Sequence, residues 1–325
     1  MRPAAYSWRE HPLRRLKLRN RSATVAAVED LLAARSPALA VFSAGGAFPF
    51  IDLLELCLAK GVPFVTIAQA NSEAAWCTDD LAGRYRTAFA AAERCFFVSD
   101  ANRRLAERQI GAALPNAEVV RNPVNIDFDA RPRWPDLHRG AALRFATVGR
   151  LHPPSKGQDI LFEALAAPAW RDRRWQLHLY GEGAMRDGLE RLSRSLGLSD
   201  RIVFAGFAPV EEIWSANHAL VMPSRFEGLP LAMVEAMLCA RPVIATDVAG
   251  HAEIVEDGVT GFLADAPTPR ALAAALERFW AKRDQAEEIG KAGAARIRRL
   301  MPADPVQAFS QKLGALANAR GPSVR

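Results

Sequence analysis

Long hydrophobic runs are missing from this chain of 325 residues. No stretch of eighteen or more uncharged apolar residues is present, which disfavours a transmembrane helix. The basic first residues lack the apolar segment of a secretory signal. The four cysteines form no C-x-x-C pair, so the sequence disfavours both a metal site and a disulfide framework. These absences favour a cytoplasmic protein, and the chain shows no internal repeat or low-complexity tract.

The composition is that of a globular protein with two domains. Half of the residues are apolar and 24% are charged, which is ordinary for a globular chain. A length of 325 residues exceeds what one hydrophobic core usually fills. We therefore expect two cores.

Positive charge gathers in the first 21 residues, in a chain of net charge +6. Such a cluster suits an anionic substrate or peripheral contact with the inner face of a membrane, and a solvated arm is the plainer alternative. Nucleic acid is disfavoured as a partner because the sequence shows no stacking-aromatic pattern and no known binding module. The basic residues are Arg2, Arg9, Arg14, Arg15, Lys17, Arg19 and Arg21, against the single acid Glu10.

Short β-branched and aromatic runs alternate with helical patterns along most of the chain, which predicts an α/β protein with parallel sheets. The expected strands are 39–44, 63–68, 95–99, 118–121, 144–148, 176–180, 202–205, 220–222, 243–246 and 261–263. The expected helices are 50–60, 81–92, 101–109 with Asp100 as its cap, 158–166, 184–196, 210–215, 229–239 and 270–282. Ligands of open parallel sheets bind beyond the carboxyl ends of the strands.

The domain break is expected around residues 123–142, which are rich in Pro, Arg and Trp and lack periodicity. This predicts one domain over residues 1–128 and a second over 141–301. Residues 302–325 follow a proline break, and their pattern predicts a separate helix.

The segment SRFEGLPLAMVEA, residues 224–236, carries the strongest chemical signal. It places Glu227 in a Gly/Pro loop and Glu235 eight positions later in an apolar run. If Pro230 opens a helix, the free N–H groups of the first turn favour an anion, and a carboxylate can bind hydroxyl groups. A sugar nucleotide carries both kinds of group. The alternative is a surface loop before an ordinary helix with a solvated glutamate.

This segment resembles the Glu-x7-Glu signature of retaining glycosyltransferases of family 4, which have the GT-B architecture. Four further segments occur in the order that the family has, all within roughly residues 143–265. They are VGRLHPPSKG (148–157), LYGEG (179–183), FAGF (204–207) and AGHAEIVEDGVTGFL (249–263), the last with Ala249 in place of the family's first glycine. The resemblance implies two Rossmann-like domains whose parallel sheets face each other across a cleft, with the terminal helix crossing back onto the first domain.

The resemblance also implies roles for individual residues. Arg150 and Lys156 would neutralise the diphosphate of the donor and its leaving charge, and arginine suits this as a bidentate donor. Glu227 would contact the transferred sugar, and Glu235 would bind the ribose hydroxyls. The backbone of residues 204–207 would lie against the base, with Phe207 on the donor side, although core packing is the better interpretation for this side chain. The other residues expected at the donor are Gly149, Gly181, Gly206, Arg225, Gly228, Leu229, Pro230 and Leu231.

The implied reaction is transfer of a sugar from a UDP- or GDP-linked donor to a glycan or lipid-linked acceptor, with retention at the anomeric carbon. The two cations and the helix N-terminus would stabilise the leaving diphosphate without a cofactor or metal. The adjacent acids Asp79 and Asp80 have the wrong spacing for a D-x-D metal site and lie in the other domain.

The first domain departs from the family pattern. The family begins with a strand and a glycine-rich loop, and the nearest candidate, Gly45-Gly46, follows a later strand. We therefore expect a shortened first domain. Gln69 stands where the family commonly has a histidine; Gln69 and Asn71 would lie on the acceptor and sugar side, or form an ordinary polar loop. The departure leaves a second hypothesis, a non-catalytic sugar-nucleotide-binding protein or a partner-dependent subunit.

Overall fold

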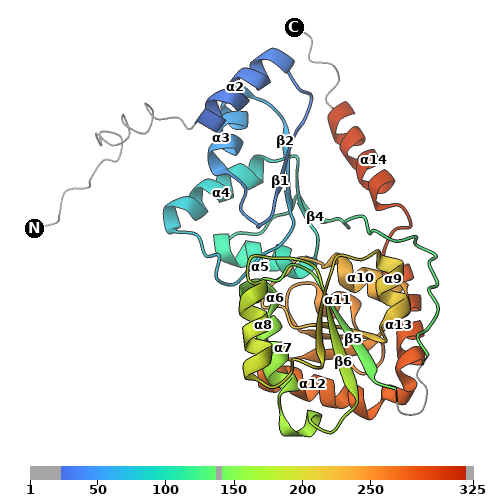
Figure 1. Ribbon diagram of the computed structural model, residues 1–325. Helices are drawn as coiled ribbons and strands as arrows, with labels where there is room; N and C mark the ends of the chain where they lie inside the picture. The colour runs from blue at the N-terminus through green and yellow to red at the C-terminus, as the bar shows by residue number, and fades with distance from the viewer. Residues whose placement is uncertain (1–22, 137–140, 320–325) are drawn as a thin grey trace, which may run out of the picture.

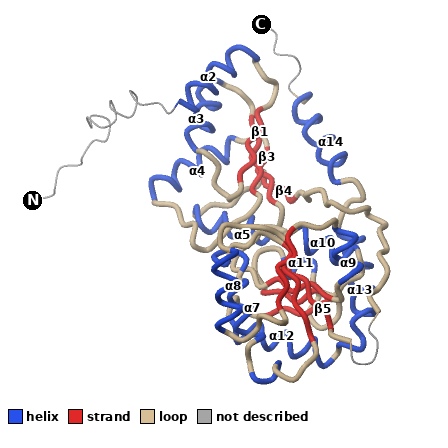
Figure 2. Tube along the Cα trace, in the orientation of Figure 1, coloured by secondary structure: helices blue, strands red, loops and turns tan. Residues whose placement is uncertain are grey.

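The computed structural model describes residues 23–136 and 141–319 and contains two separate parallel sheets. Figure 2 shows the strands in two groups, one above the other, with helices around each. The basic cluster of the first 21 residues lies outside the described residues.

The first sheet has four parallel strands in the order β1-β2-β3-β4. They are β1 (Ala40–Ala44), β2 (Phe64–Ala68), β3 (Arg94–Phe97) and β4 (Ala117–Val119). Four helices lie at the same end of the molecule: α2 (Ala23–Arg35), α3 (Ile51–Lys60), α4 (Asp79–Ala91) and α5 (Asp100–Ile110). They bury one face of the sheet, where Phe64 and Phe97 pack with Leu54 and Phe89.

The other face of the first sheet is covered by the last helix, α14 (Pro305–Asn318). Phe309 of α14 packs edge-on against Phe96 of β3, with 5.1 Å between the ring centroids. Val65 and Ile67 face the same side, so β2 is buried on both faces, and its residues are apolar except for Thr66. Figure 1 shows α14 beside this sheet although it follows the second domain in the sequence.

The second sheet has six parallel strands in the order β10-β9-β8-β5-β6-β7. Chain order therefore reverses between β5 and β8, which makes their carboxyl ends the switch point where open α/β sheets bind ligands. The strands are β5 (Leu143–Val148), β6 (Trp175–Tyr180), β7 (Ile202–Gly206), β8 (Ala219–Met222), β9 (Val243–Thr246) and β10 (Gly261–Ala264).

Helices cover both faces of this sheet. On one face Phe145 and Leu177 pack with residues of α7 and α12, and on the other Leu220 and Met222 pack with residues of α10 and α13. The helices are α6 (Pro153–Lys156), α7 (Gln158–Leu165), α8 (Arg186–Ser195), α9 (Val210–Ala216), α10 (Leu231–Leu238), α11 (His251–Ile254), α12 (Pro269–Ala281) and α13 (Ala286–Leu300), with 3-10 turns at Pro168–Trp170 and Arg283–Gln285.

The chain between the two sheets runs along the side of the second domain (Figure 1). Buried Arg241 donates to the carbonyl oxygen of Arg133, and Arg298 donates to the carbonyl oxygens of Phe128 and Ala130. The guanidinium of Arg241 also lies 4.8 Å from the ring centroid of Trp134. This part of the linker is therefore attached to the second domain.

All ten expected strands are confirmed, with no end shifted by more than two residues. The expected cap of α5 was wrong: Ser99 is the N-cap and its hydroxyl accepts from Asn102 N, because Asp100 already lies inside the helix and pairs with Arg103. Pro230 is the N-cap of α10 and not its first residue. Helices α2 and α13 were not expected.

No described helix is both long enough and apolar enough to span a membrane.

Candidate functional site

Three strand-end loops fit closely together at the switch point of the second sheet. A Cβ on Gly157 would lie 1.9 Å from the carbonyl oxygen of Pro223, which follows β8. A Cβ on Gly181, which follows β6, would lie 2.2 Å from the carbonyl oxygen of Gly149, which follows β5. Both positions need glycine because the backbones touch. The expected residues Gly149 and Gly181 therefore shape the loops that carry the charged groups.

Lys156 and Glu227 form an ion pair across this switch point. The ammonium of Lys156 lies 2.5 Å from Oε1 of Glu227, and the hydroxyl of Ser224 donates to the same oxygen at 2.8 Å. Arg150 is exposed in the loop after β5, and its side chain has no hydrogen-bond or ion-pair partner within residues 23–136 and 141–319. The site thus contains one free cation and one cation held by a nearly buried carboxylate.

The loop after Glu227 carries unpaired backbone donors. Within the described residues, the N–H groups of Gly228, Leu229 and Leu231 have no hydrogen-bond acceptor. Pro230 has no N–H group, and its carbonyl oxygen accepts from Met233 at the start of α10. Buried N–H groups at a helix N-terminus favour an anion. Residues 228–231 therefore present unpaired N–H groups at the site, and their binding of phosphate stays a prediction.

Glu235 points at the linker. Its carboxylate is 4% exposed, and Oε1 accepts from the backbone N–H of Asn125 at 3.0 Å and from Nδ2 of Asn125 at 3.2 Å. Burial raises the pKa of Glu235, while the hydrogen bonds from Asn125 oppose the rise. The sequence had not indicated this partner.

Arg225 is not free to bind phosphate in this structure. Its guanidinium makes a bidentate pair with Asp159 of α7, at 2.8 and 2.7 Å, and donates to the carbonyl oxygen of Pro153. Burial raises the pKa of Asp159, but the hydrogen bonds and charge of Arg225 outweigh it and leave this pKa below its usual value. Arg225 therefore ties the loop after β8 to α6 and α7.

Phe207 is 84% exposed, so the alternative of core packing is wrong. It follows Gly206, which ends β7 with a φ of 69° and directs the chain out at the carboxyl edge. An exposed ring at this edge is available for a planar ligand.

The first domain contacts this site through the ends of β2 and β3. Asn71 is 5% exposed, and its side chain donates to Oε1 of Gln109 at 2.9 Å, so it is engaged within the protein. Gln69 accepts from Asn122 and donates to Ser43. Neither side chain is free for a substrate in this structure.

A buried layer of hydrogen bonds lies beneath Glu227. The hydroxyl of Thr246 donates to the carbonyl oxygen of Ser224, and the carbonyl oxygen of Thr246 lies 2.6 Å from Nδ1 of His251. This contact makes Nδ1 the protonated nitrogen. Burial lowers the pKa of His251, so its ring is held neutral below the pair of Lys156 and Glu227.

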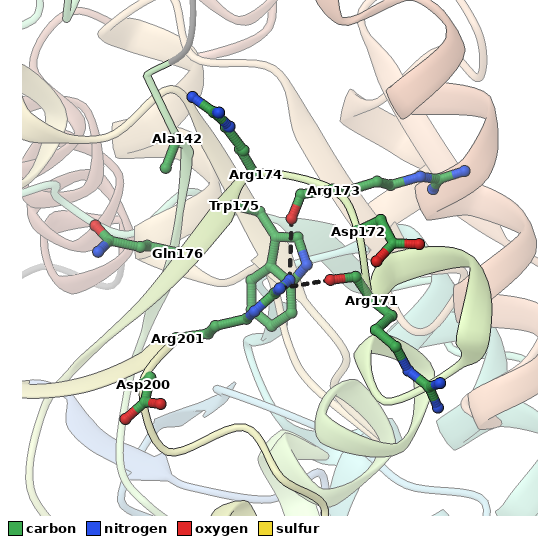
Figure 3. Close-up of a pocket in the computed structure, with 9 residues that line it drawn as sticks. All are labelled: Ala142, Arg171, Asp172, Arg173, Arg174, Trp175, Gln176, Asp200 and Arg201. Atoms are coloured by element: carbon green, nitrogen blue, oxygen red, sulfur yellow. Dashed lines mark hydrogen bonds between the residues drawn. The ribbon is translucent and has the colours of Figure 1, made fainter.

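The cavity in Figure 3 lies at the opposite, amino edge of the second sheet. It has a volume of about 460 Å³ and is lined by Arg171, Trp175 and Arg201 among others. Arg201 covers the ring of Trp175 and donates to the carbonyl oxygens of Arg171 and Arg173, as the dashed lines show. The guanidinium of Arg201 therefore stabilises the turn before β6. This cavity is separate from the predicted site, which lies at the carboxyl edge of the sheet.

The described residues contain no group of three or more His, Cys, Asp or Glu side chains arranged to hold a metal ion. The linker contains one D-x-D sequence, in which Asp127 and Asp129 flank Phe128. Oδ1 of Asp127 accepts from the backbone N–H of Asp129, which is a local turn contact. Cys57, Cys77, Cys95 and Cys239 are all free thiols.

Sequence reasoning missed the partners that hold the site together. Asn102 binds the carbonyl oxygen of Glu227, 125 positions away, and Asn125 binds the carboxylate of Glu235, 110 positions away, which no local pattern indicates. The hydroxyl of Ser224 binds Glu227 within the same segment, three positions away. Asp159 carried no signal, because an acid in the first turn of a helix is common on its own.

Residues 142–282 match the family model described as Glycosyl transferases group 1. This segment includes every strand of the second sheet and is less than half of the chain. It contains all of the expected donor-side residues from Gly149 to Glu235.

Curated relatives match over a similar region. The alpha-D-kanosaminyltransferase of Streptomyces kanamyceticus is 36% identical over 135 residues, which are 41% of this chain and 35% of that protein. The GDP-mannose-dependent alpha-(1-6)-phosphatidylinositol monomannoside mannosyltransferase of Mycolicibacterium smegmatis is 31% identical over 198 residues, 55% of this chain and 51% of that protein. The chain thus spans about half or less of the length of these relatives.

Solved structures match over nearly the whole chain. HepE from Anabaena in complex with UDP has a TM-score of 0.71 at 21% identity, covering 90% of this chain and 82% of that one. The sucrose-phosphate synthase of Thermosynechococcus elongatus has a TM-score of 0.71 at 22% identity, covering 98% and 81%. The expected GT-B fold, with two parallel sheets in two Rossmann-like units, is confirmed.

Proposed function

We propose that this protein moves a sugar from a nucleotide-sugar donor to a glycan or lipid-linked acceptor, as a family 4 glycosyltransferase of the cytoplasm. The proposal includes retention at the anomeric carbon and catalysis without a metal ion. It keeps the domain division at residues 1–128, 141–301 and 302–325, with the donor bound by the second domain.

One observation carries the proposal. The unpaired N–H groups of Gly228, Leu229 and Leu231 directly follow Glu227, whose carboxylate holds Lys156, at the switch point of the second sheet. A diphosphate needs several N–H donors and nearby positive charge. A sugar needs acceptors for its hydroxyl groups, and a carboxylate is such an acceptor. Both requirements meet at the edge where sheets of this type bind ligands.

The reaction follows from these groups. The acceptor hydroxyl oxygen forms a bond to the anomeric carbon, the bond from that carbon to the diphosphate oxygen breaks, and the hydroxyl proton passes to the leaving phosphate. Arg150, Lys156 and the loop N–H groups stabilise the negative charge that develops on the leaving group. Lys156 would turn from Glu227 toward the phosphate when the donor arrives, which leaves Glu227 free to bind the sugar.

The identity of the donor base is open between uridine and guanosine. A relative named for GDP-mannose and a fold neighbour solved with UDP support testing both. Binding of UDP, GDP and ADP to the purified chain should be measured by isothermal titration calorimetry. We expect one of them to bind and the variant Arg150→Ala/Lys156→Ala to bind at least about a hundredfold more weakly, since two charge-assisted contacts are lost.

Lys60→Ala is a matched control, because Lys60 also forms an ion pair, 2.8 Å from Glu29 in the first domain, but lies away from the switch point. Equal weakening by Lys60→Ala and by the double variant would overturn the assignment of Arg150 and Lys156. Failure of all three nucleotides to bind would overturn the donor site. Binding without turnover of the matching nucleotide sugar, with acceptor mixtures or with water, would favour the non-catalytic or partner-dependent alternative.

A further inference from the structure

The loop that carries Glu227 is held from the first domain. The backbone carbonyl oxygen of Glu227 accepts two hydrogen bonds, from Nδ2 of Asn102 at 3.2 Å and from the backbone N–H of Asn71 at 3.4 Å. Asn102 lies in the first turn of α5 and Asn71 follows β2, so both donors cross from one domain to the other.

These two bonds fix the direction of a donor that the site uses. A trans peptide group is planar, and its C=O and N–H point in opposite directions. If the carbonyl of Glu227 points at the first domain, the N–H of Gly228 in the same peptide must point away from it. That N–H is one of the unpaired donors in the loop that leads into α10. Asn102 thus sets the direction of the Gly228 N–H through its hydrogen bond to the carbonyl oxygen of Glu227, without contacting that N–H.

The domains meet closely enough to enforce this geometry. A Cβ on Gly228 would lie 1.9 Å from the carbonyl oxygen of Gln69 and 2.7 Å from Cγ2 of Val98. A Cβ on Gly250 would lie 2.6 Å from Cβ of Ser99. Glycine at both positions lets the second domain approach the strand ends of the first.

The side chain of Asn102 has little freedom to do anything else. It is 1% exposed, and the N–H of the same residue is bound by the hydroxyl of Ser99 at the cap of α5. Glu253 of the second domain accepts from the N–H of Ala101 at 2.8 Å, which holds the same helix end across the interface. Burial and the hydrogen bond from Nδ2 to the carbonyl oxygen of Glu227 hold this amide in one orientation.

The second glutamate of the motif is held in a similar way by the linker. Oε1 of Glu235 accepts both the backbone and side-chain N–H groups of Asn125, and these are the only hydrogen bonds of this carboxylate within the described residues. Both donors bind Oε1, and Oε2 has no hydrogen bond within the described residues. The next linker residues are attached to the second domain through Arg298 and Arg241, so Asn125 is not a loose contact.

We propose that Asn102 and Asn125 are positioning residues, which from the first domain and the linker set the Gly228 N–H and the Glu235 carboxylate for binding of a nucleoside diphosphate. The donor site of the second domain is then complete only when the first domain is docked. This inference rests on the proposed function for the identity of the ligand, and its geometric part stands without it.

The geometry can be tested in the free protein by NMR. The chain has only two Glu-Gly peptides, Glu182-Gly183 and Glu227-Gly228. Labelling Glu carbonyl carbons with ¹³C and Gly nitrogens with ¹⁵N therefore leaves two cross-peaks in a carbonyl-selective spectrum, one of which is an internal reference. Asn102→Asp keeps the shape of the side chain and replaces its N–H donor by an oxygen. We expect the carbonyl resonance of Glu227 to move upfield, as it does when a hydrogen bond is lost, while the Gly183 peak stays in place.

Asn116→Asp is the matched control. Nδ2 of Asn116 donates to the carbonyl oxygens of Phe89 and Ala92 inside the first domain, so this variant loses comparable bonds without touching the interface. It should leave both cross-peaks unchanged. Asn102→Ala serves as the second variant if the aspartate variant does not fold, and a Glu227 peak unmoved in the folded variant overturns the proposal.

A nucleotide titration tests the functional part. With the nucleotide that the wild type binds, we expect Asn102→Asp and Asn125→Ala each to raise Kd about tenfold, the effect of one lost hydrogen bond, and Asn116→Asp to leave it within about twofold. Affinities that follow the loss of Tm equally in all three variants would show a merely structural role and overturn the proposal. If the wild type binds no nucleotide, the proposed function fails, while the spectra of the free protein still decide whether Asn102 sets the Glu227-Gly228 peptide.

Discussion

The ammonium of Lys156 lies 2.5 Å from Oε1 of Glu227. Lys156 ends the short helix α6 after β5, and Glu227 lies in the loop after β8, so the two residues stand on either side of the switch point. Their side chains are only 21% and 10% exposed, so neither charge is well solvated without the other. The ion pair holds the Lys156 ammonium and the Glu227 carboxylate in place in the free protein. Its contribution to the free energy of unfolding can therefore be measured apart from catalysis.

The variant Lys156→Met should destabilise the protein by about 2–4 kcal/mol, because it leaves the carboxylate of Glu227 in a poorly solvated place without its cation. Adding Glu227→Gln should restore part of this loss, with a coupling energy of about 1–3 kcal/mol in the double-mutant cycle. Urea denaturation of the four proteins measures it. Strictly additive effects would show that the pair contributes no mutual stabilisation.

Glu235→Gln should become more stabilising relative to the wild type as the pH rises from about 4 to 7. Burial raises the pKa of Glu235 above its unfolded value, so the folded wild type binds this proton more tightly than the unfolded chain does. The wild type therefore loses stability as pH rises through this range, and the glutamine variant does not lose that share. Asn125 can still donate to the amide oxygen of the variant. Thermal unfolding at several pH values checks the sign, and a constant difference in Tm would contradict it.

The local pattern of the sequence predicted the strands well because apolar runs and their flanking turn residues are read over a few positions. It also brought Gly149, Lys156 and Glu227 to one sheet edge, since the carboxyl ends of parallel strands meet there. It did not predict which charged groups pair. Arg225 was expected at the donor and instead binds Asp159, a partner 66 positions away that no local signal indicates.

The same limit applies to helix ends and to helices α2 and α13. Ser99 and Asp100 are both good cap residues, and only the backbone angles of Ser99, φ −146° and ψ 153°, decide between them. Glycines inside α13 weaken its helical pattern, yet Gly290 is required there because a Cβ would lie 1.9 Å from the carbonyl oxygen of Ala240. Packing of α13 against the backbone of Ala240 therefore requires glycine at this position, although glycine has a low helix propensity.

Asp159→Asn should reduce stability at neutral pH by about 1 kcal/mol, an estimate kept small because both partners are about one third exposed. The pKa of Asp159 lies below its usual value, so its contribution is present above the unfolded pKa and is lost as the pH falls through the folded value. The difference between variant and wild type should therefore shrink below about pH 4, near the usual pKa of an aspartate. Asp187→Asn, a change at an exposed position of α8, is the control and should show no such convergence.

Gly157→Ala should be among the most damaging single changes in the second domain. Gly157 has a φ of 64°, which strains any residue with a side chain, and its Cβ would lie 1.9 Å from the carbonyl oxygen of Pro223. Strain and overpacking each cost about 1–3 kcal/mol, so a loss of about 2–5 kcal/mol is expected.

The same change at Gly188 has the opposite expectation, because this glycine lies inside the exposed helix α8 and a Cβ would approach only a flexible arginine end at 3.9 Å. Gly188→Ala should stabilise the protein by about 0.5–1 kcal/mol through helix propensity. Chemical denaturation of the two variants measures both signs. A Gly157→Ala variant as stable as Gly188→Ala would mean that the loops after β5 and β8 do not touch in solution, and that the switch point is wider than this structure shows.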